Sequence, residues 1–180
     1  MVEVRLRAVR VDLQSNTPVL LLQEQEGLER TLPIFIGAPE ATAIAFAIQG
    51  MDTPRPMTHD LIRDLLEVLS TDVVRVMITE LRGSTYYAEI VLRREGGEEL
   101  AVSSRPSDAV AVAVRTGTPL YVNDELMDAQ GMLLPIDDDD SGGEDEEGAS
   151  DEEGATANPD ELVGEFRTFL DTIRPEDFSP

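Results

Sequence analysis

The sequence contains no cysteine, no tryptophan and no lysine, and it has a single histidine. Without cysteine, thiol nucleophiles, disulfides and thiolate metal sites are excluded. Without lysine, Schiff-base chemistry and a phosphate-loop lysine are excluded, and all 14 basic residues are arginines. Because there is one histidine, the metal motifs that need two histidines are excluded as well.

Aromatic residues make up only 4% of the chain, too few to predict a stacking platform for single-stranded nucleic acid. No long hydrophobic run is present either. The longest apolar-rich stretch, residues 41–48, is too short to cross a bilayer, so we expect a cytoplasmic protein with no membrane partner. The net charge of −23 argues against nucleic acid as a partner, because polyanions repel one another.

That charge is unevenly distributed along the 180 residues. Of the 37 acidic residues, 13 lie between Asp137 and Glu161, among glycine, alanine and serine. Such a composition cannot bury a core, so residues 137–157 are predicted to be an acidic disordered linker. Residues 158–180 begin with Asn158-Pro159 and carry apolar residues at helical spacing, which predicts an amphipathic C-terminal helix and tail. The folded domain is then residues 1–136.

Hydrophobic periodicity within residues 1–136 predicts an α+β domain with a mainly antiparallel sheet and about three helices. The apolar stripe of the second helix, with Thr58 as N-cap, is expected to be buried through Leu61, Leu65, Leu66 and Leu69. The predicted strands cover 2–13, 19–23, 31–36, 72–81, 86–93 and 99–103, and the predicted helices cover 37–49, 58–69 and 106–115.

Polar groups concentrate at the three predicted helix starts, in residues 36–41, 54–60 and 103–109. Free backbone N–H groups at helix N-termini bind phosphate well. His59 could accept a proton from water or coordinate a metal there; the alternative is a surface histidine beside a cap. Glu40, Asp60 and Asp108 could hold Mg²⁺ or Mn²⁺, or they simply complement the helix dipole at about 0.3–1 kcal/mol each.

Three arginines belong to the same segments or end the third helix: Arg55 between two prolines, Arg105 before Pro106, and Arg115. A guanidinium can form two parallel hydrogen bonds to a phosphate, but each arginine could instead pair with a nearby carboxylate. Arg115 lies near a helix C-terminus, where a positive charge interacts favourably with the helix dipole, so it could be present for that reason alone.

Three long segments together carry a family resemblance: LPIFIGAPEATAIAFAIQG at 32–50, PRPMTHDL at 54–61 and SSRPSDAVAVAVRTGTPLYV at 103–122. They resemble the bifunctional nuclease (BFN) family, over about residues 2–135. The resemblance implies an α+β fold with a mostly antiparallel sheet, cleavage of RNA and DNA, and self-association as a homo-oligomer, which we expect to be a dimer.

We therefore predict a nuclease that hydrolyses phosphodiester bonds of RNA and DNA with little sequence preference. His59 would activate water, while Asp60, Glu40 or Asp108 would orient His59 or bind the divalent ion. Substrate would contact Arg55, Arg105, Arg115, Ser107 and Thr58. The alternative is a non-enzymatic binding or regulatory module that recognises an anionic ligand or a protein partner. The nuclease prediction requires these residues to meet in one pocket.

Overall fold

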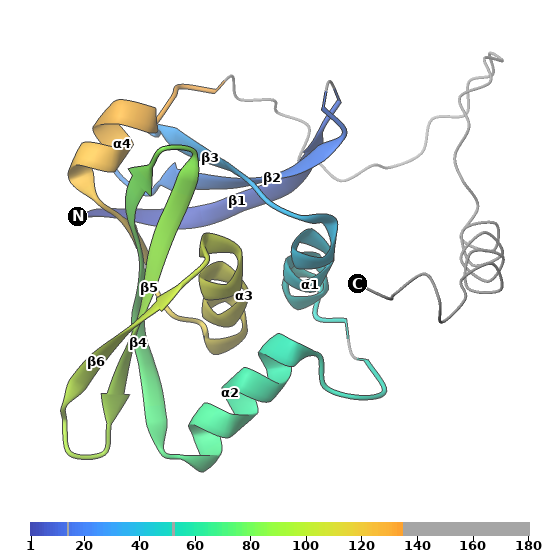
Figure 1. Cartoon of the computed structure of the whole chain (residues 1–180), viewed down its shortest axis with the longest axis vertical. Coiled ribbons are helices and arrows are strands. Elements are labelled where there is room, and N and C mark those ends of the chain that lie inside the picture. Colours follow the sequence, from blue (N-terminus) through green and yellow to red (C-terminus); the bar gives the residue numbers. More distant parts are fainter. Residues whose placement is uncertain (14, 52, 135–180) are drawn as a thin grey trace, which may run out of the picture. The chain divides into compact units, whose positions relative to one another are not determined.

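The computed structural model describes residues 1–13, 15–51 and 53–134 (Figure 1). The predicted linker 137–157 and C-terminal helix 158–180 lie outside these residues. The described part contains seven strands and four helices. The strands are β1 (Val2–Asp12), β2 (Thr17–Glu24), β3 (Thr31–Phe35), β4 (Thr71–Arg82), β5 (Thr85–Arg94), β6 (Glu99–Ser104) and β7 (Leu120–Val122). The helices are α1 (Ala38–Ile48), α2 (Thr58–Val68), α3 (Pro106–Thr116) and α4 (Asp124–Gln130).

All seven strands form one sheet in the order β3-β2-β1-β7-β4-β5-β6. Neighbouring strands are antiparallel except β4 and β7, which are parallel. The predicted α+β class with a mainly antiparallel sheet is therefore confirmed. A bulge interrupts the first strand pair, since the β1–β2 register shifts between Leu6 and Ala8.

The central strand β7 and the helix α4 escaped prediction from the sequence. β7 has only three residues, too few to show a period-2 alternation, yet it joins the β1–β3 meander to the β4–β6 strands. Its ends Leu120 and Val122 are buried. The two halves of the sheet thus depend on a very short segment, held by pairing on both sides.

Helix α3 is central to the helical layer, with α1 and α2 both packed against it (Figure 1). Its run of alanines and valines from Ala109 to Ala113 is fully buried, because small side chains let the neighbouring helices and strands approach closely. The helix ends at Gly117, whose φ of 66° is the left-handed conformation that glycine adopts without strain. No helix in the described ranges is both long enough and apolar enough to span a membrane.

The second helix differs from prediction at its start and along its apolar face. Its N-cap is Met57, and Thr58 is the first helical residue. The expected buried stripe is wrong: Leu61, Leu65 and Leu69 are 51%, 52% and 68% exposed. Periodicity shows which residues share a helix face, but it does not show whether another element covers that face.

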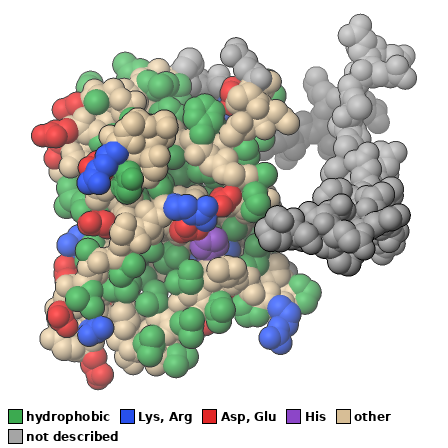
Figure 2. All heavy atoms as spheres, in the orientation of Figure 1, with side chains coloured by type: hydrophobic (Ala, Val, Ile, Leu, Met, Phe, Trp, Pro, Cys, Tyr) green, Lys and Arg blue, Asp and Glu red, His purple; other side chains and the backbone are tan. Residues whose placement is uncertain are grey.

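Helix α2 has no fully buried residue. The half-buried residues Ile62 and Leu66 alternate with the exposed leucines along the helix, which packs on α3 and β4. Figure 2 shows hydrophobic side chains gathered over α2 on the visible face of the molecule. An apolar helix surface therefore remains uncovered in the described part of a single chain.

Candidate active site

Three helices begin close together, and each carries a carboxylate at its third position: Glu40 in α1, Asp60 in α2 and Asp108 in α3. This position favours acidic residues, because their side chains can reach the free N–H groups of the first turn. Because α1 and α2 both pack on α3, carboxylates far apart in the sequence are brought into one region. Arginine side chains join them there.

Arg105, the N-cap residue of α3, lies between two of these carboxylates. Its Nε and Nη2 donate to Oδ2 and Oδ1 of Asp108 at 2.7 and 3.0 Å, and its Nη1 donates to Oε1 of Glu40 at 2.8 Å. These bonds use three of the five N–H groups of the guanidinium, which leaves two for a ligand. The side chain is 65% exposed, so a ligand can reach it.

His59 contacts the same aspartate, with Nε2 at 3.2 Å from Oδ1 of Asp108. Burial alone would raise the pKa of Asp108, but hydrogen bonds from Arg105 and His59 outweigh it and hold that pKa below its ordinary value. An ionised carboxylate can only accept, so Nε2 must donate. In the neutral imidazole, Nδ1 is then a free acceptor, and it has no hydrogen-bond partner among the residues that the structure describes.

The histidine is partly accessible, with a side chain 12% exposed. Figure 2 shows it on the surface, next to arginine and carboxylate side chains. Asp108 thus fixes the orientation of His59 while Arg105 lies at the solvent side of the pair. This arrangement places a proton acceptor beside a cation with unused donors.

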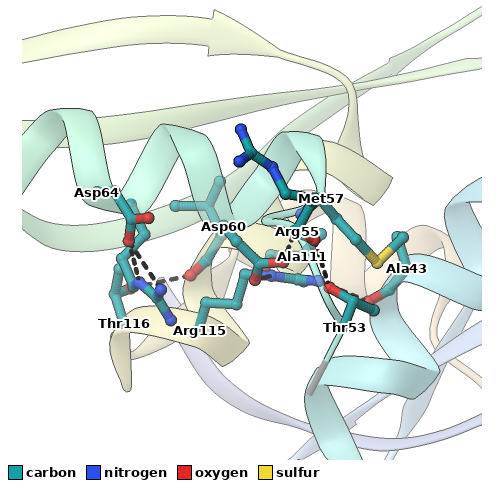
Figure 3. A network of polar contacts seen from close by, with 11 residues as sticks. Ala43, Thr53, Arg55, Met57, Asp60, Asp64, Ala111, Arg115 and Thr116 are labelled. Atoms are coloured by element: carbon teal, nitrogen blue, oxygen red, sulfur yellow. Dashed lines mark hydrogen bonds and ion pairs between the residues drawn. The ribbon is translucent and has the colours of Figure 1, made fainter. Parts of the chain in front are cut away.

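Asp60 forms a second, more enclosed cluster with Arg115. Nε of Arg115 donates to Oδ1 of Asp60 at 2.6 Å, and its two terminal nitrogens donate to the carbonyls of Ala111 and Ala43 at 3.0 Å (Figure 3). Oδ2 of Asp60 accepts from the N–H of Met57 at 2.9 Å. Burial opposes ionisation of Asp60, yet the bonds from Arg115 and Met57 lower its pKa. Arg115 is only 4% exposed, so this cluster ties α1, α2 and α3 together.

Glu40 depends on the glycine before α1 for its position. A Cβ added at Gly37 would lie 2.2 Å from Oε2 of Glu40, so the absence of a side chain lets the carboxylate fold over the helix start. From there its other oxygen reaches Arg105. The glycine therefore serves the ion pair between α1 and α3.

The three other sequence candidates lie in different surroundings. Arg55 is exposed in the segment before α2, and its guanidinium has no partner in the described part of the chain. Thr58 is exposed at the first position of α2. Ser107 is 6% exposed and lies at the second position of α3. The structure thus joins His59, Asp108, Arg105 and Glu40 directly, with Asp60 and Arg115 in the adjoining cluster.

A pocket of about 250 Å³ opens beside the Arg105 cluster. It is bounded by the end of β3 and the start of α1, by the β4–β5 turn, and by the start of α3. The sequence pointed to Glu40, Arg105 and Ser107, but it did not point to Phe35, to Ser84 in the β4–β5 turn, or to Thr85 and Tyr86 at the start of β5. The signal for Phe35 was an aromatic side chain at a strand end directly before a polar helix start.

Carboxylate oxygens such as these are the usual ligands of Mg²⁺ and Mn²⁺. Among the described residues, however, no three histidine or acidic side chains gather in a way that could hold a metal. Arg105 engages both carboxylate oxygens of Asp108 and Oε1 of Glu40. A metal bound to these oxygens would compete with that guanidinium.

Comparison with known proteins finds a match between residues 20–135 and the family described as "Bifunctional nuclease domain". An uncharacterized protein of Mycobacterium tuberculosis is 44% identical over 176 residues, covering 98% of this chain and 97% of the relative. Bifunctional nuclease 1 of Oryza sativa subsp. japonica is 28% identical over 119 residues, covering 65% of this chain. Bifunctional nuclease 2 of Arabidopsis thaliana is 29% identical over 115 residues, covering 63% of this chain. The aligned regions are 36% and 35% of these two plant proteins.

Proposed function

This chain belongs to the bifunctional nuclease domain family, and on that premise we propose that the His59–Asp108–Arg105 cluster hydrolyses phosphodiester bonds of RNA and DNA. The observation that carries the proposal is a free imidazole Nδ1 beside an exposed arginine that keeps two unused N–H donors. Such a pair supplies a base for water and a cation for the phosphate.

In the proposed reaction, Nδ1 of His59 takes a proton from a water molecule whose oxygen attacks phosphorus. The new bond joins the water oxygen to phosphorus, and the bond from phosphorus to the leaving nucleoside oxygen breaks. The proton then passes from His59 to that leaving oxygen, so the products are a phosphate monoester and a hydroxyl group. Asp108 orients the ring and stabilises the imidazolium that forms transiently.

Arg105 would bind the non-bridging phosphate oxygens through its two free N–H groups. Negative charge grows on those oxygens as water attacks, so a fixed guanidinium stabilises the transition state more than the ground state. Glu40 works against binding, because its carboxylate repels the phosphate and competes for the same cation. Arg115 and Asp60 would act indirectly, by holding the start of α2 and therefore His59.

Water as the nucleophile explains why both nucleic acids would serve as substrates, because no step uses the ribose 2′-hydroxyl. Contacts to phosphate carry no sequence information, which supports the low sequence preference. Arg55 would add a further phosphate contact, because it is exposed and unpaired in the described residues. Ser107 and Thr58, at the starts of α3 and α2, stay candidates for substrate contacts.

The proposal is tested by cleavage of single-stranded RNA and DNA oligonucleotides by the purified protein. We expect His59→Ala to slow cleavage by about 100-fold or more, the usual contribution of a general base. Arg63→Ala is the matched control, because Arg63 lies on the same helix in an exposed pair with Asp64, and it should leave the rate unchanged. Undiminished cleavage by a folded His59→Ala protein would remove His59 from the mechanism.

A parallel reaction with a chelator tests the predicted use of Mg²⁺ or Mn²⁺. Loss of cleavage that either ion restores would support a metal that displaces Arg105, whereas cleavage that survives chelation would support the metal-free route above. Tight binding of the oligonucleotides without turnover would favour the alternative, a binding or regulatory module for anionic ligands.

Self-association is part of the same proposal. Four apolar residues of α2 and its C-terminal end are at least half exposed: Leu61, Leu65, Val68 and Leu69. A second copy could cover such a surface. Light scattering should give the mass of a dimer for the wild type and of a monomer for Leu65→Glu, and a wild-type monomer would contradict this part.

A further inference from the structure

The pocket beside Arg105 has walls of two chemical kinds. One side is aromatic, formed by Phe35 at the end of β3 and Tyr86 at the start of β5. The other side is polar, formed by Ser107, Glu40 and Ser84. Arg105 lies at the same pocket, so a phosphate held by its free N–H groups would lie next to this cavity.

Phe35 is unusual for an aromatic residue in this sheet. Its strand neighbours Leu32 and Ile34 are 0% and 3% exposed, whereas Phe35 is 61% exposed. The open part of the ring is available at the wall of the pocket. An open ring face is suited to stacking with a planar ligand.

Ser107 adds a polar group to the wall of the pocket. The residue is 6% exposed and lines the pocket, and its hydroxyl has no hydrogen-bond partner in the described ranges. Among the described residues the buried side-chain atoms without a partner are Oγ1 of Thr31 and Oγ of Ser104, so the Ser107 hydroxyl is still reached by solvent from the pocket. A ligand with donors or acceptors on its edge would replace the water at this hydroxyl by a direct hydrogen bond.

We propose that this pocket binds one unpaired nucleobase of the strand whose phosphate Arg105 holds. The base would stack against Phe35 and Tyr86, and its edge would face Ser107. This inference rests on the proposed function and names its substrate class: single-stranded segments, because a base within a duplex cannot enter. Stacking is tolerant of sequence, since every base has a π-face, so the pocket does not conflict with low sequence preference.

A phosphate alone would not use the aromatic wall, and an apolar ligand would displace water from Ser107 and Glu40 without replacing its hydrogen bonds. A nucleobase uses both sides at once, because its faces are apolar and its edges are polar. The position of the pocket beside a phosphate-binding cation also matches the covalent order of base, sugar and phosphate in a nucleotide.

The test compares two short phosphorothioate oligothymidylates that differ only in one central abasic site, with binding measured by calorimetry. We expect the wild type to bind the base-bearing probe about 5- to 150-fold more tightly than the abasic probe. Phe35→Leu keeps an apolar side chain but loses the ring, so it should reduce this ratio toward one. Equal affinity of the wild type for both probes would overturn the proposal, as would an unchanged ratio in a folded Phe35→Leu variant.

Tyr87→Leu is the matched control for the aromatic wall. Tyr87 follows Tyr86 on β5 and therefore points to the opposite side of the strand, where its ring lies 5.1 Å from the guanidinium carbon of Arg82. This variant should keep the wild-type ratio. Loss of the ratio in Tyr87→Leu together with Phe35→Leu would assign the effect to the sheet in general and overturn the pocket.

The test of the base pocket and the test of the nuclease proposal can fail independently. Cleavage that is indifferent to the abasic site refutes the base pocket and leaves phosphodiester hydrolysis standing. Binding that depends on the base and on Phe35, without any cleavage, supports the pocket and refutes the hydrolytic step.

Discussion

Two regions of this molecule contain an arginine held between two carboxylates, and they differ in what surrounds the arginine. Arg30 donates to Glu24 at 2.6 and 3.1 Å and to Asp128 at 2.7 Å. Arg105 donates to Asp108 and Glu40 at closely similar distances. Arg30 is 20% exposed and its partner Glu24 is 4% exposed, whereas Arg105 is 65% exposed.

The comparison shows that pairing with carboxylates does not by itself distinguish a structural arginine from a functional one. The Arg30 pair is largely enclosed, and the hydrogen bonds from Arg30 lower the pKa of Glu24. The Arg105 pair instead adjoins the chain's one histidine and a pocket, and its guanidinium is exposed. Exposure and neighbouring groups therefore indicate a structural role for Arg30 and a functional role for Arg105.

The largest expected effect comes from removing the exposed cation. Arg105→Met should slow oligonucleotide cleavage by about 100- to 1,000-fold, because a charge that stabilises the transition state is lost. Arg30→Met, the matched change in the enclosed region, should leave the cleavage rate unaltered and lower the melting temperature. Equal rates for Arg105→Met and the wild type would erase the distinction between the two regions.

The next largest expected effect comes from removing Arg115 from its buried cluster with Asp60. Arg115→Met should reduce the free energy of unfolding by about 3 kcal/mol, because Asp60 and two backbone carbonyls lose their donor in a partly buried setting. Urea unfolding measures this change. A destabilisation no greater than that of the exposed-pair variant Arg63→Met would show that the Arg115 cluster does not tie the helices together.

The stability that Asp60 provides should depend on pH in a defined direction. Its folded-state pKa lies below the ordinary value of 3.8, so its contribution is complete above that value and is lost as pH falls through the folded-state pKa. The difference in unfolding free energy between wild type and Asp60→Asn should therefore be constant from pH 7 to 5 and shrink below pH 3.8. An undiminished difference in strong acid would contradict this assignment.

The smallest expected effect concerns Glu40. Glu40→Gln removes a negative charge that repels phosphate, so oligonucleotide binding should tighten about two- to fivefold at low salt, the scale of a partly exposed ion pair. High salt should reduce the gain by screening. Glu80→Gln, which changes the exposed pair with Arg82, is the control and should have no effect. Weaker binding by Glu40→Gln would mean that Glu40 positions Arg105 for substrate rather than competing with it.

The sequence predicted those features that depend on local patterns. Alternation identified the long strands, and the helix-start preference for acidic residues pointed to Glu40, Asp60 and Asp108. The meeting of these helix starts follows from the packing of α1 and α2 on α3, which no local pattern encodes. The same holds for Arg115. Its position near a helix end suggested an interaction with the helix dipole, whereas in the structure it bonds to Asp60 of α2 and to the carbonyl of Ala43 in α1.

Two other features were beyond sequence reasoning for a related reason. β7 is too short to show periodicity, and its central place comes from pairing on both sides. The exposure of Phe35 and of the α2 leucines depends on what other elements leave uncovered. Amphipathic spacing identifies an apolar face, whereas its burial is a property of the assembled fold.

Because the chain has one histidine, its imidazole proton signals in an NMR spectrum are unambiguous reporters of the candidate site. Titration with a phosphorothioate dinucleotide tests most directly whether the Arg105 region, and not the Arg30 region, receives substrate. We predict a saturable shift of the His59 signals in the wild type and in Arg30→Met, and its loss in Arg105→Met. Saturable binding of the dinucleotide that leaves the His59 signals unmoved in the wild type would contradict the assignment of the active site.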